Sequence, residues 1–479
     1  MKHFLYITSL LLLLGMSSCT EDFEEINTNP NDPVSVQPSL LLRQVIYDYG
    51  EQMSYEGFVA GDLLSQHRTA LDFNLFDRHA LKSPQLGGNP WPIFYTNLRD
   101  NEIILQQAQT NVTFAVYEGP ALILKAYMAA GLTDLFGDVP YSEAFNGIDG
   151  TVTPAYDTQE TIYTGADGIL ANLDAGIAAI EAYEDVIPLE GDILYGGDLQ
   201  AWVRFANSLK IKHLLRISDR VDVSADLQAL VNEDNFITSN SDNAVFNFSN
   251  TEPNSFRLAQ LRVGDFNNFV LSETMETILV DLEDTRLNTF FRPASNTDDF
   301  NGLINGIDAT STAAVLGDLS LAGTAFREDT SVLDANFMTA WETSLALAEA
   351  AQRGLITADA QALYENGVTL AFEYWQTPLP ADYLTGNAAF NNADSSPLEQ
   401  ILTQKWIANI INGYEGWIEY RRTGFPEFMD VQASLNDGLI PVRMPYPSEE
   451  EALNADNYQT AFDATDGNSL NVRVWWDVD

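Results

Sequence analysis

The segment NFMTAWETSLALAEAAQRGLITADAQALYENGVTLAFEYW, residues 336–375, contains the two most regular helical patterns of the chain. Apolar residues recur there at intervals of three and four, which is the spacing of one helix face. The sequence therefore predicts one helix over 336–353 and a second over 359–375. Small residues fall at Ala346, Ala350 and Gly367, and small side chains let two helices approach closely.

With Gly354, Ala360 and Tyr364, these positions resemble a tetratricopeptide helix-turn-helix. The tetratricopeptide period of ~34 residues is not obvious elsewhere, so we expect a divergent array of helix pairs. Further stretches with helical apolar spacing are predicted to be helices: 39–66, 91–108, 114–136, 157–180, 199–217 and 397–420. The predicted fold class is all-α, with a tetratricopeptide-like helix-pair scaffold.

Four intervals between these helices are rich in Asn, Gly, Thr and aromatic residues: 66–90, 240–268, 292–330 and 376–397. Loops of that length in a compact protein are usually functional or disordered. Flat aromatic rings stack on the C–H faces of sugars, while Asn, Asp and Arg bond hydroxyl groups. The candidate ligand-binding residues are therefore Phe73, Phe76, Arg78, Phe256, Arg262 and Asp265, with Phe266 beside them. The alternative is that these rings pack the loops onto the body.

Most other aromatic residues fall on apolar helical faces and are predicted to be core residues. Trp202, Trp341, Trp406 and Trp417 are assigned to this class. The hydrophobic share of 46% is ample for a large core.

The N-terminus has the layout of a secretory signal, with Lys2 followed by an apolar run over 4–16 and small residues before Cys19. The run is about 13 residues long, which is too short to span a bilayer. Cys19 resembles the acylated first residue of a mature lipoprotein, although Met16 replaces the commoner Leu. The alternative is a plain secretory signal with a free thiol. We expect a signal peptide over 1–18, an acidic, Pro-rich tether over 19–38 and one helical domain over 39–479.

The chain is strongly acidic, with 23 Lys and Arg against 69 Asp and Glu and a net charge of −46. Nucleic acids and anionic lipid headgroups would be repelled by such a surface, so neither is an expected partner. The single cysteine rules out a disulfide framework. His67, His79 and His213 are not at metal-ligand spacing, and no cofactor or metal is predicted.

The common catalytic motifs GxSxG, HExxH and Walker A do not occur in the sequence. The stretch 27–32, NTNPND, has alternate oxygen ligands but lacks the acidic residue that closes a calcium loop. The protein is therefore predicted not to be an enzyme. So many carboxylates leave a paired-carboxylate glycoside hydrolase as an open alternative.

Several blocks, in order along nearly the whole mature chain, resemble the SusD/RagB family of lipoproteins, in the group with a DLFGDVPY-type signature. They are CTEDFEEINTNPNDP at 19–33, LTDLFGDVPYSEAF at 132–145, TPAYDTQETIY at 153–163, 198–219, DTRL at 284–287, AEA at 348–350 and GYEGWIEYRRTGFP at 413–426. The blocks fall mainly on predicted helices, so we assign them to the scaffold. Asp134, Gly137, Asp138 and Pro140 are expected to shape a turn, and Glu415, Arg421 and Arg422 are expected to form buried or partner-facing ion pairs.

The resemblance implies a body of four tetratricopeptide-like helix pairs whose long loops carry the ligand site. It implies lipid anchoring through Cys19 at the surface of the outer membrane, helped by the acidic residues after it. It also implies a SusC-like TonB-dependent barrel as partner, over which the protein sits as a hinged lid. Ligands in the family are mostly oligosaccharides and sometimes peptides. The peptide ligand, the surface hydrolase and a purely structural surface protein remain alternatives.

Overall fold

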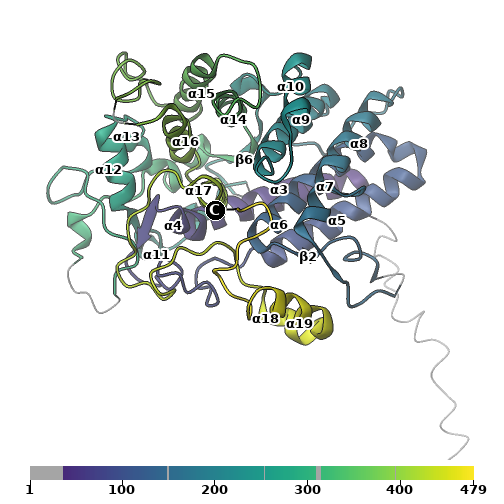
Figure 1. Cartoon of the computed structure of the whole chain (residues 1–479), viewed down its shortest axis with the longest axis horizontal. Coiled ribbons are helices and arrows are strands. Elements are labelled where there is room, and N and C mark those ends of the chain that lie inside the picture. The colour runs from purple at the N-terminus through teal and green to yellow at the C-terminus, as the bar shows by residue number, and fades with distance from the viewer. Residues whose placement is uncertain (1–35, 148–149, 253, 309–313, 394, 479) are drawn as a thin grey trace, which may run out of the picture.

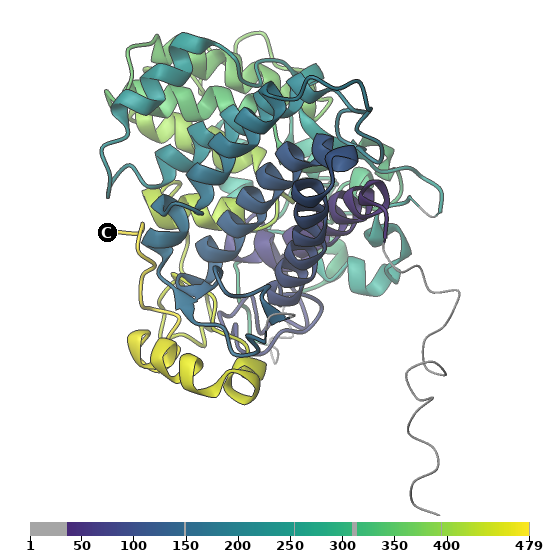
Figure 2. The same cartoon turned by 90° about the vertical axis from the view of Figure 1, so that its right-hand side faces the viewer.

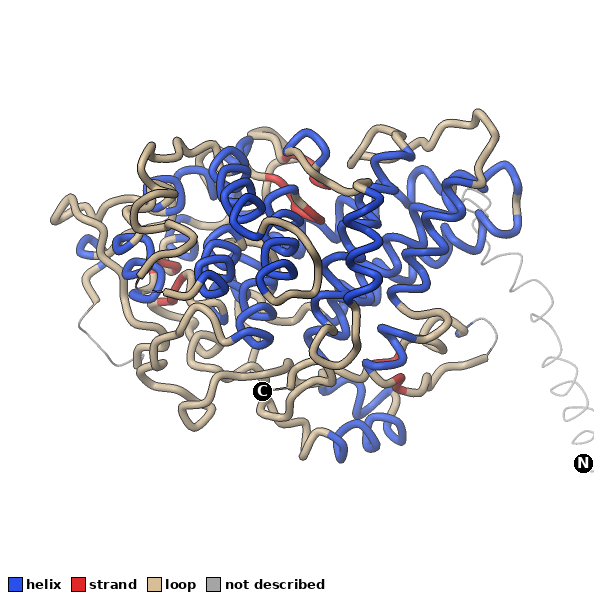
Figure 3. Tube along the Cα trace, turned by 45° about the horizontal axis from the view of Figure 1, so that its top comes forward, coloured by secondary structure: helices blue, strands red, loops and turns tan. Residues whose placement is uncertain are grey.

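The computed structural model describes residues 36–147, 150–252, 254–308, 314–393 and 395–478. Helices dominate its regular structure, and the strands are only two to five residues long. Figure 3 shows long helices gathered together and extended loops wrapped around one side of them. The predicted all-α class is confirmed.

The α-helices of the described residues are α3 (Pro38–Glu56), α4 (Asp62–Leu64), α5 (Trp91–Thr110), α6 (Glu118–Phe136), α7 (Gln159–Thr164), α8 (Ile169–Glu181), α9 (Leu199–Arg216), α10 (Ser224–Glu233), α11 (Val263–Phe266), α12 (Glu273–Asp281), α13 (Leu287–Phe290), α14 (Ala340–Gln352), α15 (Ala360–Tyr374), α16 (Pro397–Ala408), α17 (Glu415–Thr423), α18 (Ser448–Leu453) and α19 (Ala455–Ala464). The strands form three antiparallel pairs: β1 (Arg68–Ala70) with β5 (Phe269–Leu271), β2 (Val139–Pro140) with β3 (Tyr156–Asp157), and β4 (Ala244–Asn247) with β6 (Asp334–Met338).

The long helices pack as successive pairs. Helix α3 packs on α5, α6 on α8, α9 on α10, and α14 on α15. Each pair also touches the next, through α5 on α6, α8 on α9 and α9 on α14. The pairs therefore form a continuous scaffold, which occupies the right and top of Figure 1 and faces the viewer in Figure 2. The tetratricopeptide-like arrangement predicted from residues 336–375 is confirmed.

Close packing within these pairs depends on glycine. A Cβ atom at Gly367 in α15 would lie 2.7 Å from Leu345 Cγ in α14. One at Gly119 in α6 would lie 2.8 Å from the backbone oxygen of Gly176 in α8. Separations below about 3 Å are shorter than van der Waals contact. Any larger residue at these positions would therefore push the helices apart. Small residues do let these helices approach closely, as their spacing predicts.

Three predicted helices are shorter than their apolar patterns. The helix expected over 336–353 begins at Ala340, because residues 334–338 form β6 and pair with β4. The one expected over 397–420 is interrupted between α16 and α17, where Ile411 and Gly413 have positive φ angles of 63° and 53°. The one expected over 157–180 is divided between α7 and α8 by residues 165–168. In each case tertiary contacts or turns override local periodicity.

The predicted turn after α6 is present. Gly137 adopts φ 77° and ψ −125°, and its amide donates to Thr133 O at 2.7 Å. The Asp138 carboxylate accepts a hydrogen bond from Gln159 N at 2.8 Å, at the start of α7. Pro140 pairs with Tyr156 in the β2–β3 ladder. Asp134 does not shape the turn, because its side chain belongs to a buried ion cluster described below.

The tryptophans assigned to the core are buried as predicted. Trp202, Trp341, Trp406 and Trp417 are at most 1% exposed, and Trp476 joins them. Their burial supplies a large share of the hydrophobic stabilisation, since each large aromatic side chain removes about 150–250 Å² from water. Among the described residues, no helix is both long and apolar enough to cross a bilayer.

Candidate functional site

Two of the four predicted long loops meet through strand pairing. Strand β1 lies in the 66–90 loop and pairs with β5, which directly follows the 240–268 loop. Beyond the ladder, Asn268 continues the contact: its backbone oxygen accepts from Leu71 N at 3.0 Å, and its side-chain oxygen accepts from Asp72 N at 2.6 Å. The two loops therefore lie side by side, near the labels α4 and α11 in Figure 1.

A buried carboxylate, Asp77, ties a third loop to these two. It accepts hydrogen bonds from Thr69 Oγ1 (2.7 Å), Asn305 Nδ2 (2.7 Å) and Gly306 N (2.7 Å), and a longer one from Ala70 N (3.3 Å). Burial raises the pKa of Asp77 to about 6, against the lowering effect of these donors. Asp77 thus fixes the 66–90 loop to residues 304–306.

A fourth segment completes this side of the molecule. Arg78 donates from Nε to Ala433 O at 2.8 Å, and Leu435 N donates to Arg78 O at 2.6 Å. His79 Nδ1 lies 3.1 Å from Leu439 O. We call the resulting surface the loop face, defined by residues 66–90, 261–268, 300–307 and 428–439. Arg78, a candidate ligand residue, is half-buried here and positions the fourth segment.

Phe73 is the only phenylalanine, tyrosine or tryptophan of the described residues whose side chain is classed as exposed, at 51%. Its backbone has a φ angle of 50°, in the left-handed region that L residues with large side chains avoid. Its amide donates to Asp72 Oδ1 at 2.8 Å, and Asp72 is held by Asn268. Such strain, of order 1–3 kcal/mol, persists where the surroundings enforce it and is common at ligand sites. Phe73 is therefore the leading candidate for a ligand-stacking ring.

Two other predicted ligand rings belong to the core instead. Phe76 is 3% exposed and its ring lies over Gly88, where an added Cβ would be 2.4 Å from Phe76 Cε2. Phe256 is fully buried and stacks on Phe248 with ring centroids 4.7 Å apart. Phe266 is likewise buried. The expectation that these rings are exposed is wrong, because the loops fold onto the body and leave neither face of the rings open.

Arg262 and Asp265 remain at the surface of the loop face. The Arg262 side chain is 84% exposed and makes a two-point ion pair with Asp265, Nε to Oδ2 at 2.8 Å and Nη2 to Oδ1 at 2.9 Å. This hydrogen-bonded pairing lowers the pKa of Asp265 and keeps it ionised. The pair belongs to the same loop as Asn268, which anchors Asp72 beside Phe73. The structure thus brings the loops of Phe73, Arg262 and Asp265 together.

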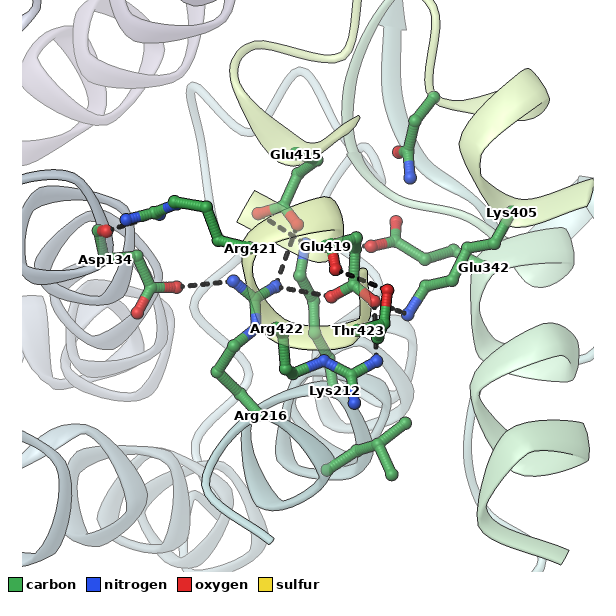
Figure 4. Close-up of polar contacts among 12 residues, drawn as sticks. Asp134, Lys212, Arg216, Glu342, Lys405, Glu415, Glu419, Arg421, Arg422 and Thr423 are labelled. Atoms are coloured by element: carbon green, nitrogen blue, oxygen red, sulfur yellow. Dashed lines mark hydrogen bonds and ion pairs between the residues drawn. The ribbon is translucent and has the colours of Figure 1, made fainter. Parts of the chain in front are cut away.

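The strongest concentration of charge lies elsewhere, inside the scaffold (Figure 4). We call it the ion cluster. Arg216 contacts Asp134 (3.0 Å), Glu415 (2.9 Å) and Glu419 (3.0 Å). The remaining pairs are Lys212 with Glu342 and Glu415, Lys405 with Glu419, and Arg422 with Glu349 and Glu419. The predicted ion pairs of Glu415 and Arg422 are confirmed; the Arg422 side chain is 3% exposed and that of Glu415 17%. Arg421 differs, since it donates to the carbonyls of Val442 and Asp134, each at 2.7 Å.

Two glutamates of the ion cluster, Glu415 and Glu419, are held ionised. Burial would raise the pKa of Glu415, but Lys212 and Arg216 outweigh it and lower that pKa to about 2. The pKa of Glu419 is lowered well below its usual value by Arg422, Lys405 and Arg216, again against burial. A glycosidase needs one carboxyl that stays protonated near neutral pH. Glu415 and Glu419 do not meet that requirement, and their role is structural.

Metal binding has no support in the described part of the chain, where no group of three or more His, Cys, Asp or Glu side chains could hold an ion. His67 contacts Asp62 Oδ1 (3.1 Å) and Trp406 O (2.9 Å), and the three histidines of the described residues, His67, His79 and His213, are buried. Cys19, the acidic leader after it and the 27–32 stretch lie outside the described residues.

Comparison with known proteins decides the family. A family model described as starch-binding and associating with the outer membrane matches residues 30–447. The chain belongs to the SusD-like family. The sequence matches none of the curated proteins.

SusD homologues also share the fold. A chitin-binding SusD homologue from Flavobacterium johnsoniae has a TM-score of 0.76 at 23% identity, covering 92% of this chain and 98% of its own. A SusD homologue from Bacteroides fragilis has the same TM-score and identity, covering 92% and 99%. A third, from Bacteroides uniformis, has a TM-score of 0.76 at 24% identity, with the same coverage. This family consists of binding proteins associated with the outer membrane.

Sequence reasoning missed the residues that organise the loop face. Asp77, Asn268 and Asn305 each connect loops that are far apart in the chain. Nothing local distinguishes them from the other Asp and Asn residues of these loops. Only the non-local strand pairing of β1 with β5 reveals their role.

Proposed function

We propose that this SusD-like protein captures oligosaccharides at the cell surface and delivers them to a SusC-like TonB-dependent barrel in the outer membrane. It makes or breaks no bond in the ligand. The signal peptide is 1–18, the lipid is attached at Cys19, and 19–38 is the tether to a single domain over 39–479. The family's association with the outer membrane and the resemblance of the 19–33 leader support this proposal.

One observation carries the ligand assignment: Phe73 is 51% exposed on a loop that hydrogen bonds hold in place. An exposed aromatic ring on a left-handed backbone raises the free energy of the folded state in two ways, through exposed apolar surface and through backbone strain. On the adjoining loop, which Asn268 ties to Asp72, the polar groups of Arg262 and Asp265 are available to bond the hydroxyls of a sugar whose ring stacks on Phe73. We assign these three residues to ligand contact. Arg78 positions the loops, and Phe76 and Phe256 support them.

The overall charge favours a neutral glycan. A net charge of −46 repels sulfated or uronic-acid chains, and steering of this kind acts at long range. The family description names starch, and one structural relative is a chitin-binding homologue. Maltoheptaose and chitohexaose are therefore the first ligands to try.

Isothermal titration of the mature chain with these two oligosaccharides tests the ligand assignment. We expect binding of at least one, weakened about tenfold or more by Phe73→Ala, since a good ring contact contributes roughly 1.5 kcal/mol. Phe73→Tyr keeps the ring and should retain affinity. Leu439→Ala, which removes another exposed apolar side chain of the loop face, is the matched control. Equal affinity of Phe73→Ala and the unaltered chain would overturn the assignment of Phe73.

Affinity purification of the tagged protein from its native outer membrane tests the partner. The proposal predicts a TonB-dependent barrel in stoichiometric amount, and a Cys19→Ala form that no longer sediments with membranes. Recovery of the protein alone, in mild detergent and at native expression, would contradict the delivery role.

A further inference from the structure

A second surface with the features of a sugar site lies on helix α5, outside the loop face. It is an open groove of about 560 Å³ between α5 and the segment that follows β2. Pockets that hold small molecules usually measure ~300–1,000 Å³. The groove is lined by Tyr95, Thr96, Arg99, Glu102, Gln106 and Phe145, among others. None of these residues belongs to the loop face.

The groove contains two half-buried aromatic rings in a fixed arrangement. Tyr95 and Phe145 both line the groove, with ring centroids 6.4 Å apart and planes inclined at 43°. The Tyr95 hydroxyl donates to Pro140 O at 2.7 Å, and its ring packs 4.8 Å from Trp91. A ring held at both ends loses little further freedom when a ligand stacks on it, which favours binding.

Polar side chains follow the same helix face as Tyr95. Arg99, Glu102 and Gln106 lie four, seven and eleven residues after it, which is the spacing of one stripe along a helix. The Arg99 side chain is 62% exposed, and its Nε and Nη2 bond the Asp100 carboxylate at 2.9 and 2.8 Å. Glu102 is 3.8 Å from Lys125 Nζ. The stripe therefore presents donors and acceptors of both charge signs next to the rings.

This combination selects a class of ligand. A ligand that stacks on the rings needs flat apolar faces. A ligand that bonds the polar stripe needs several hydroxyl or amide groups. The presence of both Arg99 and Glu102 gives no preference for a charged ligand. A neutral pyranose has apolar C–H faces and a rim of hydroxyls, and it satisfies all three conditions.

We propose that the α5 groove is a second carbohydrate-binding site, which contacts a neutral glycan independently of Phe73. The choice of a glycan rests on the proposed function, whereas the site itself rests on the groove. Two sites on one chain would retain a polysaccharide far better than either alone, because the second contact forms within the bound complex.

Titration of the full mature chain with chitohexaose and maltoheptaose tests this site. Phe145→Ala removes one of the two aromatic rings that line the groove. Thr96→Arg fills the groove from an exposed position and keeps both rings. Val112→Ala removes an exposed apolar side chain outside the groove and is the matched control. We expect two binding events in the unaltered chain, one of which weakens about tenfold or more in both groove variants. The thermal midpoint of Thr96→Arg should match that of the control, whereas Phe145→Ala also loses the packing of a half-buried ring and is read only together with Thr96→Arg.

The pattern of loss separates the two proposals. If Phe73→Ala abolishes all binding and both groove variants titrate like the unaltered chain, the groove is overturned and the loop-face site stands. If the groove variants abolish binding and Phe73→Ala has no effect, the groove stands and the loop-face assignment falls. If Phe73→Ala loses one binding event and the groove variants lose the other, both sites are supported. A chain that binds neither oligosaccharide nor their polymers overturns both.

Discussion

The ion cluster and the loop face bury charge in opposite ways. In the cluster, Glu415 and Glu419 are surrounded by Lys212, Arg216 and Arg422, and their pKa values are lowered. In the loop face, the buried carboxylate of Asp77 receives four hydrogen bonds from neutral donors, and burial raises its pKa to about 6. The scaffold is therefore held by ionised pairs, whereas Asp77 in the loop face is a buried carboxylate without a cationic partner among the described residues. Changes of charge and pH should affect the two regions differently.

The largest effect is expected from breaking the ion cluster. Arg216→Met leaves Asp134, Glu415 and Glu419 without their shared cation, and removal of one partner from a buried pair costs about 3–5 kcal/mol. Arg292→Met breaks the half-exposed pair with Glu328 and should cost at most about 1 kcal/mol. Chemical denaturation of both variants measures the difference. Similar losses in the two variants would show that the cluster is not the stabilising centre.

The next effect is on the packing of the loop face. Phe76→Ala removes a buried ring beneath the loop and should cost about 3–4 kcal/mol, whereas Phe73→Ala, three residues earlier, should change stability by less than about 0.5 kcal/mol. Thermal unfolding followed by circular dichroism distinguishes them. Unchanged stability of Phe76→Ala would mean that the ring is available to ligand after all.

A smaller effect is expected from pH. The pKa of Asp77 is higher in the folded than in the unfolded chain, so the folded loop face gains stability as pH falls through about 6 and loses it again as pH rises. The gain from pH 7.5 to 5.5 is about 1 kcal/mol for one group. Over the same interval Glu415, whose pKa is about 2, stays ionised, so its ion pairs with Lys212 and Arg216 should not change.

Hydrogen exchange, corrected for the intrinsic rate at each pH, measures this difference locally. Peptides covering β1 and residues 304–306 should become more protected at pH 5.5, while peptides of α14 and α15 should not change. A local reading is needed because burial also raises the pKa of Asp334, in β6, to about 6. The Asp77→Asn variant should lose the pH dependence. Equal protection of the loop peptides at both pH values would contradict the assignment of a raised pKa to Asp77.

The contrast between the two regions also explains what the sequence could predict. The scaffold helices follow from local apolar spacing, and the ion pairs of Glu415 and Arg422 are expected, as buried or partner-facing pairs, from the block at 413–426. The loops have no such periodicity. Phe73 and Phe76 are three residues apart with similar neighbours, yet one is exposed and the other buried. Their difference depends on Gly88, at the other end of the same loop, and on Asn268 and Asn305, which reach the loop only after the chain has folded.

The α5 groove likewise could not be predicted from local sequence patterns. The apolar spacing of residues 91–108 identified the buried face of that helix, with Ile93, Phe94, Leu98 and Ile104. Tyr95, at the edge of that face, and the exposed Arg99 have no local pattern that marks a binding site. Phe145 joins Tyr95 only because Pro140 and the β2–β3 ladder direct the following segment back across α5. A site formed by two segments cannot be identified from either pattern alone.

The smallest expected change in stability is at the strained residue itself. The backbone of Phe73 has a φ angle of 50°, in the left-handed region. Asn adopts this conformation with less strain than an aromatic residue does. Phe73→Asn should therefore leave the free energy of unfolding unchanged or raise it by up to about 1 kcal/mol, while the ring contact to ligand is lost. Denaturation and oligosaccharide titration of the same sample measure both quantities. A gain in stability with a loss of affinity would show that the strain is retained for binding; a loss of stability would show that the Phe73 ring contributes to packing and that its exposure needs another explanation.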